Sequence, residues 1–184
     1  PLKRELKQAE RGIDAAVLAL ESVLAHPTSA DLVPELVVGT SLQAAEIATQ
    51  LDEKTLTALL THLAKLLKEE KLAGSALQWF ECMSTVEQAS TKCWDLLRRK
   101  ETWTGVDVNG VLGWLHQDLM EKQKSQKVPW LLKDDDVASL LFGAADERLL
   151  VSLVPWGSLR DYRRQIPEGK YEPIGKLLHE AVPK

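Results

Sequence analysis

The side chains best suited to metal or nucleophilic chemistry are spread too widely along this sequence to form a site. A zinc site or a metalloprotease helix needs His and Cys in close pairs. Here the histidines and cysteines stand apart from one another: His26, His62, His116, His179, Cys82 and Cys93. We expect helical surface histidines and two reduced, buried thiols.

Two further patterns invite a chemical interpretation and do not support one. The carboxylates of Asp134–Asp136 open a helix and point in different directions, so they fit capping better than metal binding. The glycines of Asn109–Gly113 follow a polar turn instead of a strand, unlike a dinucleotide fingerprint. The sequence predicts no catalytic, cofactor-binding or metal-binding residue, no small-molecule substrate, and a protein that is not an enzyme.

Two basic clusters are the candidates for contact with nucleic acid. Cations at helix ends usually complement the helix dipole, and a net charge of -4 gives no general attraction to phosphate. Near the carboxyl end, however, we expect three arginines to share a helical face with Tyr162. RNA or DNA backbone contact is therefore kept as the alternative function, through Arg98, Arg99, Lys100, Arg160, Arg163 and Arg164.

The chain has six tryptophans but only two Phe and two Tyr. Three of them lie at breaks between helical stretches, at Trp103, Trp130 and Trp156. Tryptophan is enriched among interface hot spots because its rigid face buries much area at little entropic cost. We predict these three, with Arg160 and Tyr162, as the partner-binding residues; the structural alternative is that they fill gaps between helices.

Leucine stripes at spacings of three and four residues must position all these side chains, and they predict an all-α fold. The clearest stripe runs from Leu56 to Leu67 with Asp52 as its N-cap. Further starts are expected at Ser41, at a capping box over 84–87, at Asp107 and at Asp134. The sum is eight or nine helices in antiparallel hairpins, forming a bundle or a short solenoid-like stack.

Length and composition predict a single domain over 1–184, with a possible subdivision into 1–128 and 129–184. The run 149–154 fits a helix or a short buried strand equally well.

The chain starts inside a helical pattern, so we expect it to be a fragment of a larger protein. No apolar run reaches the ~18 residues of a membrane span, and reduced thiols favour the cytosol or nucleus.

Part of the chain resembles a known family. Leu51, the leucines of 59–67 and the segment Ala76–Phe80 resemble the helical domain that follows the propellers of WD-repeat ribosome-assembly factors. The resemblance implies a nucleolar scaffold that assembles in the small-subunit processome and has no catalytic residues.

Taken together, these features predict a non-catalytic, intracellular module for protein interaction or complex assembly. The partner is expected to be a protein, either a second copy or a different chain. Nucleic acid is the less favoured partner, and no membrane contact is expected.

Overall fold

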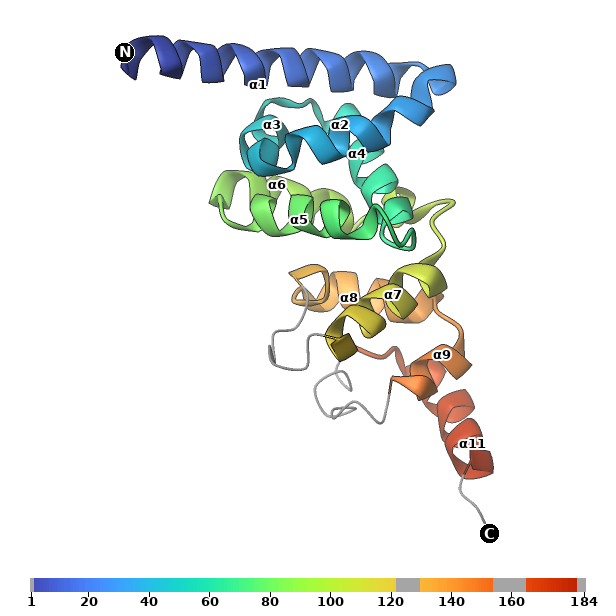
Figure 1. Cartoon of the computed structure of the whole chain (residues 1–184). Helices are drawn as coiled ribbons and strands as arrows, with labels where there is room; N and C mark the ends of the chain where they lie inside the picture. Colours follow the sequence, from blue (N-terminus) through green and yellow to red (C-terminus); the bar gives the residue numbers. More distant parts are fainter. Residues whose placement is uncertain (1, 122–129, 154–164, 182–184) are drawn as a thin grey trace. The chain divides into compact units, whose positions relative to one another are not determined.

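The computed structural model describes residues 2–121, 130–153 and 165–181, with side chains described except at 2–3, 5–11, 118–121 and 181. These residues form helices and turns and contain no strand, which confirms the predicted all-α class (Figure 1). The chain divides into two compact units, Pro1–Val106 and Asp107–Lys184, each described by itself below.

Unit 1 is a set of short helices packed under one long one. The long helix α1 packs against α2, α3 and α4, while α5 and α6 pack against α3, α4 and each other (Figure 1). The elements are α1 (Leu2–Ala25), η1 (Pro27–Leu32), α2 (Val33–Thr40), η2 (Ser41–Gln43), α3 (Ala44–Gln50), α4 (Glu53–Leu66), α5 (Ala73–Ser84), α6 (Glu87–Leu97) and η3 (Lys100–Trp103).

The leucine stripe of α4 forms the centre of this unit. Leu56, Leu59, Leu60 and Leu63 are fully buried, as their spacing of three and four residues predicts. The helix begins as expected at Asp52, whose carboxylate accepts a hydrogen bond from the Thr55 amide at 2.6 Å. The sequence therefore identifies this helix, its buried face and its first residue.

From Pro27 to Gln50 the chain is almost continuously helical, passing through η1, α2, η2 and α3. The last turn of α3 is capped by a side chain from another helix. The Lys92 ammonium on α6 donates to the carbonyls of Ala48, at 3.1 Å, and of Leu51. A cation at a helix C-terminus satisfies carbonyls that have no partner within the helix. This contact fixes the end of α3 against α6.

Unit 2 has its own core. In it α7 packs on α8, η4 on α8, and α9 on α11. Lys170 ties α9 to η6 by donating to the Ala145 carbonyl and pairing with Glu147, both at 2.8 Å. The described elements are α7 (Val108–Glu121), η4 (Trp130–Leu132), α8 (Asp135–Ala144), α9 (Glu147–Ser152), η6 (Glu168–Lys170) and α11 (Tyr171–Ala181).

Two expected serine caps are wrong, for one physical reason. Ser84 belongs to the end of α5, where its hydroxyl donates to the Glu81 carbonyl at 2.5 Å, and Val86 is the N-cap of α6. The hydroxyl of Ser41 similarly turns back to the Val38 carbonyl at 3.5 Å. Serine bonds the carbonyls of a preceding turn as readily as the amides of a following one, so its type alone does not fix its role.

Two other outcomes concern the later part of the chain. The ambiguous run 149–154 is helical as far as Ser152, in α9, which Asp146 caps by accepting from the Arg148 amide at 2.8 Å. The boundary between the two units falls between residues 106 and 107, whereas the sequence suggested a boundary between 128 and 129. Gly105, at φ +74, makes the turn here, a conformation that costs glycine little.

Candidate interaction surface

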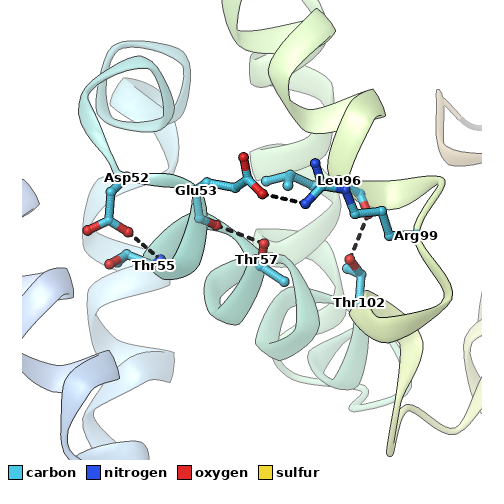
Figure 2. Close-up of polar contacts among 7 residues, drawn as sticks. All are labelled: Asp52, Glu53, Thr55, Thr57, Leu96, Arg99 and Thr102. Carbon is cyan, nitrogen blue, oxygen red and sulfur yellow. Dashed lines mark hydrogen bonds and ion pairs between the residues drawn. The ribbon is translucent and has the colours of Figure 1, made fainter.

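The first basic cluster lies where α6 ends and η3 begins, and its two arginines are already paired. The Arg98 guanidinium lies 3.4 Å from the Asp95 carboxylate. Arg99 donates to the carboxylate of Glu53, at the start of α4 (Figure 2). This hydrogen bond and the charge of Glu53 raise the pKa of Arg99. Lys100 is exposed at the start of η3.

Backbone-directed hydrogen bonds hold both partners of the Glu53–Arg99 pair in place. Thr57 donates to the Glu53 carbonyl at 2.7 Å, and Thr102 donates to the Leu96 carbonyl at 2.6 Å (Figure 2). A further bond of 2.7 Å runs from the Thr61 hydroxyl to the Thr102 carbonyl and joins α4 to η3. The arrangement joins two helices within unit 1 and compensates the positive charge of the cluster.

Trp103 and Trp130 are buried within their own units. The Trp103 side chain is 6% exposed and its Nε1 donates to the Leu97 carbonyl at 2.8 Å, while Trp130 is 5% exposed in η4. Neither indole presents its face to solvent, so these two residues fit the gap-filling alternative rather than a partner surface. Trp79 on α5 is fully buried as well and donates to the Val37 carbonyl at 2.8 Å.

The remaining predicted contact residues lie outside the residues that the structure describes. They are Trp156, Arg160, Tyr162, Arg163 and Arg164.

The thiols and the inner histidines lie in surroundings that suppress their charged forms. Burial raises the pKa of Cys93 to about 12, and burial followed by the charges of Glu46 and Glu81 raises that of Cys82. Burial, then the charge of Lys65, lowers the pKa of His62. Within the described ranges, no three His, Cys, Asp or Glu side chains are grouped so as to hold a metal ion.

A row of exposed apolar side chains on the segment η1–α2–η2 is the most distinctive surface of unit 1. Leu32 is 49% exposed, Val38 50% and Leu42 80%. We call these three residues the apolar stripe. Within α2, a rotation of 100° per residue places Val38 away from the buried Val33 and Val37, on the side of the exposed Glu35 and Gly39. Leu32 and Leu42 lie in the 3-10 turns that precede and follow α2.

The opposite side of the same segment is buried in unit 1. Val33 and Val37 are each 1% exposed, and Ala44 and Ile47 in α3, which follows the segment, are fully buried. The segment is thus apolar on both sides, and packing within unit 1 covers only one of them.

The sequence contained this signal, but periodicity did not identify the outer side. Val33, Val37 and Val38 are all apolar. The spacing of apolar residues alone therefore does not show which face of the helix is buried. The buried side is fixed by where α1 and α5 pack, which is tertiary information. The stripe becomes visible only once the packing assigns Val33 and Val37 to the core.

Comparison with known proteins found no match for the chain. No family model, no curated protein and no solved structure matches it. The resemblance of residues 51–80 to WD-repeat ribosome-assembly factors therefore stays a prediction. In the part of the chain that the structure describes, no helix has the length and apolar character needed to cross a membrane.

Proposed function

We propose that the chain is a non-catalytic helical module for protein interaction or complex assembly, and that the apolar stripe is its contact surface. The observation that carries the proposal is the exposure of Leu32, Val38 and Leu42 on one side of a helical segment whose other side is core. An intracellular setting, in cytosol or nucleus, fits a protein whose Cys82 and Cys93 are free thiols.

Exposed apolar residues need an explanation only when they gather. Single ones are normal on soluble proteins, whereas contiguous apolar patches mark contact sites. Burying a leucine side chain fully contributes about 1.5–3 kcal/mol. The 80% exposure of Leu42 leaves most of that free energy available to a partner.

Nucleic-acid contact through the first basic cluster has less support. Arg98 and Arg99 are paired with Asp95 and Glu53, so a phosphate would have to displace a carboxylate. The Glu53–Arg99 pair links α4 to the end of α6, whereas the Arg98–Asp95 pair lies at the end of α6 itself. Together they leave little net positive field for a phosphate backbone.

Affinity capture with matched variants tests the proposal. The full chain, Leu42→Gln and Leu18→Gln are immobilised and exposed to lysate of the source cells, and bound proteins are quantified by mass spectrometry. Leu18, 65% exposed on α1, is the control for an exposed leucine outside the stripe. Because truncating a hot spot costs 1 kcal/mol or more, we expect Leu42→Gln to reduce recovery of a defined protein by about fivefold or more.

Light scattering over a concentration series accompanies the capture. A dimer that Leu42→Gln dissociates would identify the partner as a second copy of the chain. The proposal fails if the chain is monomeric and if Leu42→Gln and Leu18→Gln recover the same proteins in the same amounts as the unmodified chain.

A further inference from the structure

Charge is distributed unevenly over unit 1, and the apolar stripe lies in the acidic part. Between Gly12 and Glu53 the sequence has seven acidic residues and no Lys or Arg. The acidic residues are Asp14, Glu21, Asp31, Glu35, Glu46, Asp52 and Glu53. Two of these charges are compensated, because Arg99 pairs with Glu53 and the charges of Lys54 and Lys92 act on Asp52. The negative charge next to the apolar stripe comes from the exposed Asp31, Glu35 and Glu46.

Several of these carboxylates border the stripe itself. Glu35 lies between Leu32 and Val38, Glu46 follows Leu42 by one helical turn, and both side chains are exposed. The field of Glu46 reaches α5, where it acts on the Cys82 thiol together with the exposed Glu81. Acidic side chains therefore border the stripe on its own segment and at the start of α3, and Glu81 on α5 acts on the same thiol as Glu46.

The lysine that reaches α3 from α6 lies at the end of that helix away from Glu46, and its charge acts on Asp52, whose pKa it helps to lower. The Lys92 ammonium donates to the carbonyls of Ala48, Thr49 and Leu51, at the C-terminal end of the helix. Glu46 is in the first turn of α3, at the other end.

The middle of the stripe is also sterically open. A Cβ atom built at Gly39, between Val38 and Leu42, meets no atom within 4 Å. A partner side chain can therefore approach the helix backbone between the two apolar residues.

We infer that the apolar stripe docks a basic amphipathic helix, with leucine-like residues against Leu32, Val38 and Leu42 and with Lys or Arg against the carboxylates of Glu35 and Glu46. The inference rests on the proposed function and names the chemistry of the partner. The three apolar residues extend over eleven positions, about 15 Å at the α-helical rise, which matches anchors at i, i+4, i+7 and i+11 of a partner helix. The apolar stems of Lys and Arg cover the edge of the apolar stripe, and their charged groups lie against the carboxylates of Glu35 and Glu46.

A synthetic peptide serves as the probe. It has about 18 residues with leucines on one helical face and lysines on the other, carries a fluorescent label and is titrated with the full chain by anisotropy. Two peptides are controls: one with Glu in place of every Lys, and one with the same composition in scrambled order. We expect binding of the first peptide only, weakening about tenfold or more between roughly 20 and 200 mM salt.

Two pairs of variants locate the site. Gly39→Lys places a positive charge in the open middle of the stripe, and Gly74→Lys places one at an exposed, equally open position of α5. Glu35→Gln with Glu46→Gln removes the rim charge, and Glu69→Gln with Glu70→Gln removes two exposed charges beyond α4. We expect each stripe variant to weaken binding by about tenfold and each control to leave it unchanged.

The results of the peptide titration can be distinguished from those of the affinity capture. Equal binding of the scrambled or the Glu peptide, insensitivity to salt, or equal effects of Gly39→Lys and Gly74→Lys would overturn the inference. Binding to vesicles of anionic lipid that Gly39→Lys strengthens would point to a membrane and overturn it as well. If capture depends on Leu42 while the Lys peptide does not bind, the inference fails and the proposed function stands.

Discussion

Cys82 and Cys93 show how position within a helix decides reactivity. Cys93 is fully buried on α6, and burial raises its pKa to about 12. Cys82 on α5 is only partly buried, although burial and the charges of Glu46 and Glu81 raise its pKa from the usual 9.0. The thiolate is the reactive form of cysteine, so the two thiols should differ in rate.

We predict that iodoacetamide at about pH 8 alkylates Cys82 in the folded protein and spares Cys93. The alkylation rate of Cys82 should rise with pH. The pKa of its thiol lies above 9.0, so the thiolate fraction grows as the pH approaches that value. Peptide mass spectrometry over time measures both rates, and unfolding in urea is the control in which both thiols should react. Equal rates in the folded protein would contradict the burial of Cys93.

Sequence reasoning at single residues succeeded where the backbone decides and failed where packing decides. Asp52 and Asp134 cap helices as expected. A carboxylate just before an apolar helical run can accept hydrogen bonds from the unpaired backbone amides of the first turn. Trp103 lies at a break, as the sequence indicated, but its indole turns inward to the Leu97 carbonyl. The direction of such a side chain depends on which helices leave space, and that is not local information.

Asp52 also shows what a cap contributes to an element. The hydrogen bond from the Thr55 amide lowers the pKa of Asp52 below the usual 3.8. A carboxyl group whose pKa is lower in the folded state stabilises that state above its unfolded pKa, and the contribution is lost as the pH falls through the folded value. The effect of Asp52 should therefore be present at neutral pH and diminish in acid below 3.8.

We predict that Asp52→Ala lowers the Tm at pH 7 and that the difference from the unmodified protein shrinks at about pH 3. Asp52→Asn is the control, since asparagine caps equally well but does not ionise. It should keep most of the Tm at pH 7. Thermal unfolding followed by circular dichroism measures these values, and a difference that is the same at both pH values would show that the charge of Asp52 has no part in the cap.

The end of α3 depends on another helix. Lys92→Met on α6 removes the donor to the Ala48 and Leu51 carbonyls while keeping an apolar side chain of similar length. We predict a loss of about 1.5–3 kcal/mol in the free energy of unfolding, the range for hydrogen bonds that involve a charged group. Urea denaturation measures it, with Lys71→Met in the exposed turn after α4 as the control. An unchanged midpoint for Lys92→Met would remove this role.

At the scale of the whole chain, the all-α class follows from the leucine stripes, whereas the division into units does not. The sequence placed its only candidate boundary at the polar run before Pro129, while the structure separates the units after Val106. Gly105 is a common kind of residue in a turn, and nothing local distinguishes a turn between units from a turn within one. The location of the apolar stripe was likewise hidden until the inner sides of the helices were assigned.

Because unit 1 has its own core, we predict that residues 1–106 fold on their own. The fragment should be helical by circular dichroism and should unfold in one cooperative transition. A fragment of residues 1–84 is the comparison, because it lacks α6 and η3, which pack on α3 and α4; it should lose cooperativity. A fragment 1–106 without a cooperative transition would mean that unit 1 needs the rest of the chain.

The central claim is that the apolar stripe contacts another protein, and site-specific photo-cross-linking in cells tests it most directly. The full chain carries a benzophenone amino acid in place of Leu42, or in place of Glu101, which is exposed in η3 outside the stripe. We predict one discrete protein adduct from position 42, absent from position 101 and lost when Gly39→Lys is added. No adduct from position 42, or the same adduct from both positions, would contradict the claim.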